Sequence, residues 1–444
     1  MPIKKSYLAI SVALVLLLCL TQIIGSTLLI VLCLAAFLVF VGWSCSNNCT
    51  LSVLLFFLPW SPILRTSPDG YSFFTFALVL VCAISVIKKR FRFKKYPIVA
   101  GIVLLFLTLV SKVIDGYMIS FDYIAFMMLI VLFPVVKAEW TVKNYDFYQV
   151  VLFFSLGVII AALCALSFDM FPNIAKYIRV DSYSTITRRS GFYGDANFYT
   201  AQITAALGGG LMMVLKEQKR GHIAVLVSLL VLLIYCGFLS ASKSFVLVTA
   251  CMVVLWGIAL LRMKGRVALK VVLLVVVIIF AAFVATSALF GELIEVVATR
   301  FSYANDLDSF TTGRTGLWQS YIADILKNVK TFFIGKGLTN VKVNDRGSHN
   351  TLIQIIYQFG FVGIPFLLYW SISFFRGGAY QGRRIRKNKI DTLLLAVGIF
   401  MPWMAIDALF FDEFFLLQWY MFDAMRYLEQ EQIPQSVPRE DRYG

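Results

Sequence analysis

YLAISVALVLLLCLTQII, residues 7–24, and STLLIVLCLAAFLVFVGW, residues 26–43, decide the fold of this 444-residue chain. Neither run contains a charged residue, and each is close to the ~20 residues that cross about 30 Å of hydrocarbon as a helix. No small-residue cleavage site separates them, so we interpret the first run as a retained span and not as a signal peptide. Similar runs recur along the chain, which is 60% hydrophobic and only 14% charged. The sequence therefore predicts an all-α polytopic membrane protein.

The hydropathy pattern predicts about 12 to 14 transmembrane helices with both termini in the cytoplasm. We expect one multi-pass domain over residues 1–428 and a polar cytoplasmic tail over residues 429–444. Two long loops, about 169–194 and 291–351, fall on the outer side. The expected spans cover residues 7–24, 26–43, 51–60, 72–88, 97–114, 122–136, 147–167, 195–215, 223–238, 244–262, 270–290, 352–374, 391–408 and 414–427.

The net charge of +16 raises the question of nucleic-acid binding, and the position of the charge argues against it. The basic residues concentrate in short loops between apolar runs, at 88–95, 216–220, 262–270 and 376–389. Lysine and arginine in short loops mark the cytoplasmic side of a membrane protein. Six of the eight cysteines lie inside apolar runs, and Cys45 and Cys49 alone cannot make a zinc site. We expect no nucleic acid, no metal, no cofactor and no structural disulfide.

The loop over residues 291–351 carries an amphipathic pattern. Apolar residues from Leu317 to Val329 recur at helical spacing. We expect a helix that begins near Gly313, has Thr312 as its N-cap, and lies along the membrane surface. The Gly335-Lys336-Gly337 segment then makes a turn. Arg314 falls in the first turn of this helix, where it either contacts lipid phosphate or binds substrate.

His349 is the candidate that points most directly to chemistry. It precedes a membrane span and shares its loop with Arg314, Arg346 and Lys336. Histidine accepts a proton near neutral pH, and arginine grips phosphate through a fixed fork of donors. Together they suit group transfer from a phosphate-activated donor. The alternative for a lone histidine here is a hydrogen-bonded residue at the membrane interface.

The loop over residues 169–194 ends in a second set of candidates, Arg188 and Arg189, followed by Asp195 and Asn197 at the start of a span. A helix N-terminus favours anions, although Asp195 or Asn197 is also an ordinary helix cap. Lys243 begins another span, as either an interfacial anchor or an anion contact. Weaker candidates are carboxylates at the outer ends of late spans and a pair in the loop after Trp60: Asp407, Asp412, Glu413, Arg65 and Asp69.

Five motifs in this order resemble the O-antigen ligase and polymerase superfamily. They are Arg189-Ser190-Gly191-Phe192-Tyr193-Gly194-Asp195-Ala196-Asn197, Ser240-Ala241-Ser242-Lys243, Gly313-Arg314 with Trp318, Gly335-Lys336-Gly337 with Ser348-His349-Asn350, and Gly360-Phe361-Val362-Gly363. The resemblance covers about residues 187–374. Two positions depart from the family pattern, since Ala196 stands where proline is common and Lys243 where arginine is common. Lysine keeps the charge and loses the bidentate grip on phosphate.

The resemblance implies a GT-C-like, metal-independent, inverting glycosyltransferase. It implies a polyprenyl-diphosphate-linked oligosaccharide donor, used at the periplasmic or outer face of the bacterial plasma membrane. By position, Arg189 and Arg314 would bind the diphosphate and His349 would act as the base or position the acceptor. The remaining candidates for binding diphosphate or glycan are Arg188, Lys243, Arg346, Lys336, Asp195, Asn197 and Asn350.

Three functions remain open at this point. The Gly191-to-Asn197 segment favours a polymerase of capsule, exopolysaccharide or O-antigen repeat units. The sister activity is a ligase that transfers the lipid-linked glycan to lipid A core or another acceptor. A polysaccharide or lipid-linked sugar transporter is the alternative from another class, with Gly208-Gly209-Gly210 as a broken helix. The bilayer is an expected partner, and a chain-length regulator or a flippase is left open as a protein partner.

Overall fold

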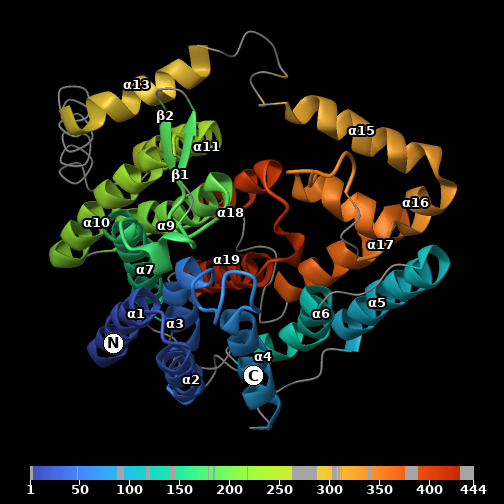
Figure 1. Ribbon diagram of the computed structural model, residues 1–444, viewed down its shortest axis with the longest axis horizontal. Coiled ribbons are helices and arrows are strands. Elements are labelled where there is room, and N and C mark those ends of the chain that lie inside the picture. The colour runs from blue at the N-terminus through green and yellow to red at the C-terminus, as the bar shows by residue number, and fades with distance from the viewer. Residues whose placement is uncertain are drawn as a thin grey trace.

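A computed structural model gives the architecture of the chain (Figure 1). It describes residues 4–430 apart from several internal segments. The segments that it leaves out are 48, 88–94, 117–120, 140–145, 179, 184–185, 218, 263–287, 303–307, 309–310, 312, 339–341 and 376–388. Most of the expected span 270–290, most of the polar tail 429–444 and the expected N-cap Thr312 lie outside the described residues.

Eight of the described helices are long and apolar enough to cross a membrane, which confirms an all-α multi-span membrane protein. They are α1 (Lys5–Ile24), α2 (Thr27–Ser44), α5 (Lys95–Asp115), α7 (Phe147–Phe168), α9 (Ala196–Lys216), α10 (Arg220–Leu239), α11 (Lys243–Arg262) and α17 (Thr351–Phe375). Other helices of the bundle are shorter or less apolar. They are α3 (Thr50–Phe57) with η1 (Leu58–Trp60), α4 (Phe73–Ile87), α6 (Phe121–Glu139), α18 (Lys389–Phe400) and α19 (Asp412–Gln430).

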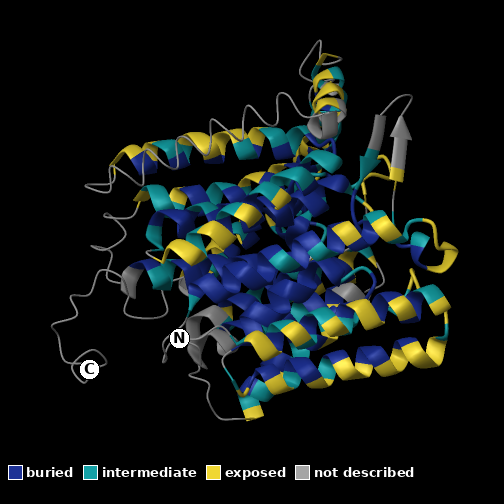
Figure 2. Ribbon diagram, turned by 90° about the vertical axis from the view of Figure 1, so that its left-hand side faces the viewer, coloured by how far each residue is buried: buried dark blue, intermediate teal, exposed yellow. Residues whose placement is uncertain are grey.

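The bundle has a buried centre and a more exposed periphery (Figure 2). Helix α9 is the most completely buried of the long apolar helices, followed by α7, whereas only 33% of the apolar window of α10 and of α11 is buried. Exposed apolar side chains such as Leu28, Val39 and Val254 face outward on peripheral helices. This distribution is expected for a bundle whose outer surface contacts acyl chains.

Close packing explains the glycine run of α9. The helix is continuous through Gly208, Gly209 and Gly210, so the broken helix considered in the sequence is not present there. A Cβ on Gly209 would overlap the Tyr420 hydroxyl, and Gly208 faces Gly398 of α18. Small residues at such contacts let membrane helices approach closely.

The late spans differ from the sequence prediction. The expected span 391–408 is cut short, because α18 ends at Phe400 and the 3₁₀ helices η2 (Met401–Ala405) and η3 (Ala408–Phe410) follow. Pro402 at the start of η2 cannot donate a backbone hydrogen bond, so the α-helix does not continue. Asp407 lies between the two 3₁₀ helices. The expected span 414–427 belongs to α19, whose residues are almost all buried in the bundle.

Additional elements gather at one end of the bundle, which we call the site end. They are the short helix α8 (Pro172–Ala175), the antiparallel hairpin of β1 (Val180–Tyr183) and β2 (Ile186–Arg189), and the helices α13 (Ala288–Ser302), α15 (Arg314–Lys327) and α16 (Val329–Ile334). Figure 2 shows the hairpin at one end of helices that run side by side. The expected amphipathic helix is thus present as α15, with exposed Ile322 and Leu326 and buried Tyr321 and Ile325.

Helix α16 and helix α17 are joined through their backbones in a contact that we call the clasp, formed by Gly335, Lys336, Gly337 and the break in α17 at Gly360. Gly360 has φ 62° and ψ −178°, which interrupts the helical hydrogen bonds. The amides of Lys336 and Gly337 donate instead to the carbonyls of residues 357 and 358, at 2.8 and 2.9 Å. The clasp holds the α15–α16 layer against α17.

Candidate functional site

Two cavities open at the site end. The first, which we call the cationic chamber, has a volume of about 720 Å³ and lies between the starts of α9, α11 and α15. Its charged lining residues are Arg188, Lys243, Arg314, Arg346 and a single carboxylate, Asp195. The excess of positive charge favours an anionic ligand.

The second cavity, which we call the aromatic chamber, has a volume of about 1040 Å³. Its lining combines rings with carboxylates and a few cations. The rings are Tyr71, Tyr123, Phe126, Tyr177, Phe192, Tyr193, Phe198, Tyr321, Tyr357, Phe411 and Phe415, and the charged residues are Asp69, Asp407, Asp412, Glu413, Arg65, Lys176 and Lys342. A large cavity that combines aromatic rings with placed polar groups is suited to an organic ligand with many hydroxyl groups.

His349 lines both chambers, and Gly194 is the other residue that they share. The imidazole is therefore the titratable side chain at the junction. The backbone of His349 has φ 48°, a left-handed conformation that is uncommon for a residue with a side chain. Such a conformation persists where the surroundings fix it, and it is concentrated at functional sites.

Asp407 holds the backbone turn around His349 in place. Its carboxylate accepts hydrogen bonds from the Ser348 hydroxyl and, at 3.1 Å, from the amide of Asn350. A Cβ on Gly347 would approach the same carboxylate to 2.4 Å, so only glycine fits beside it. The residues on either side of His349 are thus held by one half-buried acceptor, which fixes the backbone at His349.

Helix α15 contacts the same turn from the other side. Trp318 donates from Nε1 to the Ser348 carbonyl at 2.9 Å, and the Tyr321 hydroxyl donates to the Arg346 carbonyl at 2.7 Å. Arg314 begins α15. The helix therefore carries an arginine of the cationic chamber and, two turns or less away, the side chains that hold the histidine turn.

Asn350 has a structural role in this arrangement. Its side-chain oxygen accepts from the amides of Leu352 and Ile353 at 3.0 and 3.3 Å, which caps the start of α17. The residue is buried and lines neither chamber. The structure therefore places this predicted binding residue behind the site and not in it.

The hairpin separates the two neighbouring arginines. Successive side chains of a strand point to opposite faces, so Arg188 and Arg189 diverge. Arg188 lines the cationic chamber, and its Nε donates to the Ser240 carbonyl at 3.2 Å. Arg189 lines neither chamber and forms an ion pair with Asp169 at 2.8 Å. The structure thus puts Arg188 at the position that the sequence assigned to Arg189.

The Ser240–Lys243 turn organises one wall of the cationic chamber. Ala241 at its centre has φ 48°. The Ser242 hydroxyl donates to the side-chain oxygen of Asn197 at 3.0 Å. Asp195 accepts from the amide of Asn197 at 2.6 Å and is the N-cap of α9, one of the two caps predicted from the sequence. Lys243 lies beside this network, with its Nζ 5.7 Å from the ring centre of Phe301.

Arg314 is a half-buried cation of the chamber. Burial lowers the pKa of its guanidinium, the carboxylates of Asp195 and Asp407 oppose that shift, and the charge of Arg188 reinforces it. A half-buried arginine next to another cation is stabilised by an added anion. The cationic chamber therefore has the electrostatic character of a site for an anion.

Two further candidates from the surface loop separate in the structure. Arg346 lines the cationic chamber and follows a tight turn in which Asn344 and Asp345 both have positive φ. Lys336 lies in the clasp, lines neither chamber, and has its Nζ 3.9 Å from the carboxylate of Asp324. The glycines around Lys336 therefore act in helix packing.

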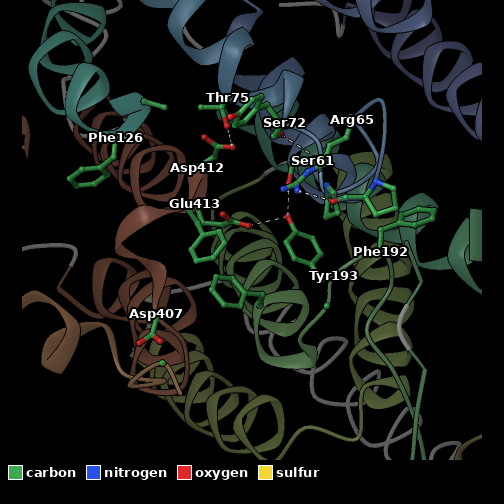
Figure 3. Close-up of a pocket in the computed structure, with 18 of the residues that line it drawn as sticks. Ser61, Arg65, Ser72, Thr75, Phe126, Phe192, Tyr193, Asp407, Asp412 and Glu413 are labelled. Carbon is green, nitrogen blue, oxygen red and sulfur yellow. Dashed lines mark hydrogen bonds between the residues drawn. The ribbon is translucent and has the colours of Figure 1, made fainter. Parts of the chain in front are cut away.

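A buried polar network forms part of the wall of the aromatic chamber (Figure 3). Glu413 accepts hydrogen bonds from the Tyr193 hydroxyl and from the Gln202 amide, both at 3.0 Å. Tyr193 also lies 3.1 Å from the Ser61 hydroxyl. Asp412, the next carboxylate, accepts from Thr75 at 2.9 Å. These contacts fix two acidic side chains at the start of α19 beside the cavity.

Sequence reasoning did not identify the aromatic chamber. Its residues come from loops and helix ends spread from Ser61 to Phe415, and no local motif connects them. The nearest signal was the group of carboxylates Asp407, Asp412 and Glu413, which the sequence placed at outer ends of late spans. Trp318 was part of a motif, but only the structure shows that it holds the histidine turn.

Comparison with known proteins gave no relative: no family model matches the chain, and no curated protein sequence matches it.

Proposed function

We propose that this protein is a membrane glycosyltransferase with a GT-C-like architecture that polymerises polyprenyl-diphosphate-linked oligosaccharide repeat units. The observation that carries the proposal is the junction of two chemically different chambers at His349. One suits a diphosphate and the other suits a glycan. A transferase that moves a sugar from a diphosphate to a hydroxyl needs these two sites on opposite sides of a base.

The proposed donor occupies the cationic chamber with its diphosphate among Arg188, Lys243, Arg314 and Arg346. Arginine and lysine stabilise the negative charge that grows on the diphosphate as the bond to the sugar breaks. Charged donors held in a partly buried cavity need little rearrangement during the reaction. These residues take the role that a metal ion plays in many other transferases.

The proposed acceptor lies in the aromatic chamber with its terminal hydroxyl at His349. The imidazole removes the hydroxyl proton as the oxygen attacks the anomeric carbon, and the diphosphate leaves from the opposite face with inversion. One glycosidic bond forms, one sugar–phosphate bond breaks, and the proton remains on His349 until solvent takes it. Asp407 and Trp318 keep the imidazole in place through the Ser348–Asn350 turn.

The proposed location of this reaction is the outer face of the bacterial plasma membrane. The support is the charge pattern, because α9, α11 and α17 begin beside the chambers and, in the sequence, basic short loops follow their other ends. Positive loops stay in the cytoplasm. Lipid-linked glycans that have crossed the membrane would meet the site end directly.

The test is a reaction of the purified protein with a single lipid-linked repeat unit. We expect a ladder of products that grow by whole repeat units, read by gel or mass spectrometry. A ligase forms no ladder from this substrate alone and instead transfers the unit to an added acceptor such as lipid A core. A transporter leaves the substrate chemically unchanged, and that result would refute the proposal.

A further inference from the structure

We propose that Arg65 and Lys176 form a second anion-binding site inside the aromatic chamber, and that its ligand is the diphosphate of the lipid-linked acceptor. The inference rests on the proposed function and adds a recognition site for the second substrate. It also bears on the choice between the two sister activities, because a polymerase joins two molecules that both carry a lipid diphosphate.

The two cations lie on loops that are fixed to the same helix. Arg65 follows η1, and its carbonyl accepts from the side chain of Gln22 on α1 at 3.0 Å. Lys176 follows α8, where Asn173 donates to the carbonyl of Ile23 at 3.0 Å. Both cations line the aromatic chamber. The end of α1 thus holds two positively charged loops at one wall of the cavity.

Neither cation has a counterion among the residues that the structure describes. The Arg65 Nε is shielded from water and has no hydrogen-bond partner within that part of the chain, while one of its other nitrogens donates to the Pro68 carbonyl at 3.3 Å. The Nζ of Lys176 lies 5.6 Å from the ring centre of Tyr177. Asp69 lines the same chamber but is exposed and forms no ion pair with either cation.

Tyr177 connects the two charges. Burial raises the pKa of its hydroxyl, whereas the positive charge of Arg65 lowers it, and the hydroxyl has no hydrogen-bond partner among the described residues. Arg65 and Lys176 are therefore both neighbours of one ring. Two cations that line one cavity without a counterion among the described residues are a favourable place for a multiply charged anion, since each would gain a charged hydrogen-bond partner.

The position of this pair fits an acceptor and not the donor. In Figure 3, Arg65 lies on the opposite side of the view from Asp407, with Tyr193 and Glu413 between them. Asp407 holds the turn that carries His349. An acceptor whose terminal hydroxyl reaches His349 extends its glycan away from the reacting centre, so its own diphosphate must lie elsewhere in the cavity.

The experiment separates the two substrates. The donor is a lipid-linked repeat unit from which the hydroxyl that attacks in polymerisation has been removed, so that it can only donate. The acceptor is supplied either as a lipid-diphosphate-linked repeat unit or as the same glycan free of lipid and phosphate. We expect R65Q/K176Q to raise KM for the lipid-linked acceptor by roughly 100-fold, about tenfold for each cation. KM for the free glycan and for the donor should stay within about twofold.

Two controls accompany the double variant. R189Q removes a cation of the same outer region that lies outside both chambers, and it should leave both acceptors unaffected. R65K/K176R keeps both charges and should restore part of the preference for the lipid-linked acceptor, because lysine also binds phosphate, as a point charge.

Three outcomes would overturn the inference. Equal losses for both acceptors would mean that the pair binds the glycan itself, for example an acidic sugar. No loss for either acceptor would mean that the pair binds nothing in the reaction. Failure of R65K/K176R to recover, with unchanged thermal unfolding, would exclude a role for charge. In each case, product formed by the wild type would still support the glycosyltransferase, so the two proposals fail separately.

Discussion

The two chambers differ in how the chain builds them. The cationic chamber is assembled from helix starts and one hairpin, and its charged residues lie in a few short motifs. The aromatic chamber draws its walls from loops and helix ends across most of the chain. A chamber for a diphosphate needs a few fixed charges, whereas a chamber for a glycan needs a broad surface. Under the proposed function, the diphosphate is the same in every substrate, whereas the sugars differ. A few short motifs are enough to build the first chamber, and the second needs residues from many parts of the chain.

His349 lies at the junction, and its removal should damage the use of both chambers. We expect H349A to lower kcat by about 1,000-fold, the usual scale of a lost general base. KM for either substrate should change little, because neither diphosphate nor glycan depends on the imidazole for binding. The measurement is initial rates with separate donor and acceptor. A variant that retains more than a tenth of the activity would remove His349 from the chemistry.

Substitutions in the cationic chamber should impair the use of the donor and not of the acceptor. We expect R314Q to lower kcat/KM for the donor by about 100- to 1,000-fold, because the guanidinium stabilises the departing diphosphate. KM for the acceptor should be unchanged. If R314Q instead weakened the acceptor, the assignment of the two chambers would be reversed.

The hairpin offers a matched pair that separates the chambers from the surface. R188Q removes a cation from the chamber, and we expect it to lower kcat/KM for the donor by roughly 10- to 100-fold. R189Q breaks an ion pair with Asp169 on the other face, and we expect less than a threefold change. The family resemblance favours the reverse order, so a larger loss in R189Q would show that the sequence motif, and not the structure, identifies the functional arginine.

Trp318 tests whether α15 positions the histidine turn. W318F keeps the ring and removes the hydrogen bond to the Ser348 carbonyl. A single neutral hydrogen bond contributes about 1 kcal/mol, so we expect kcat to fall roughly fivefold with both KM values retained. If W318F lowered the temperature of thermal unfolding and left kcat unchanged, Trp318 would stabilise the fold and would not position His349.

Removal of divalent metal ions with a chelator should have the smallest effect on the rate of chain extension. The proposed reaction uses guanidinium and ammonium groups to stabilise the leaving diphosphate, so EDTA should leave the rate of extension unchanged. The control adds back Mg²⁺ or Mn²⁺ in excess. A rate that falls with EDTA and returns with either ion would place a metal beside the cationic chamber and change its assigned role.

Much of the fold could be predicted from the sequence, because membrane spans are read from length and hydropathy. The expected spans from residue 7 to residue 262 correspond to helices with small shifts at their ends. The predicted spans were wrong in the last part of the chain, because hydropathy alone does not show where a helix ends or whether it is buried inside the bundle. Pro402 ends α18 early, and α19 is a buried helix in the bundle whose polar residues find partners inside the protein.

The site could be predicted only in part. Charged residues next to spans are visible in the sequence, and the structure brings His349, Arg314, Arg188, Arg346 and Lys243 to one cavity. Which of two adjacent arginines faces that cavity depends on the register of β2. Asn350 and Lys336 looked equally suitable, but one caps a helix and the other lies in the clasp. These outcomes follow from three-dimensional contacts that no local pattern encodes.

The clasp between α16 and α17 limits which substitutions the α15–α16 layer can accept. Its hydrogen bonds join main-chain atoms, and its close approach needs glycine at residues 335 and 360. The exposed side chains of the α15–α16 layer, such as Ile322 and Leu326, can therefore be exchanged without altering the clasp. Substitutions on the exposed face of this layer can therefore change what the layer contacts, while the main-chain attachment to α17 stays the same.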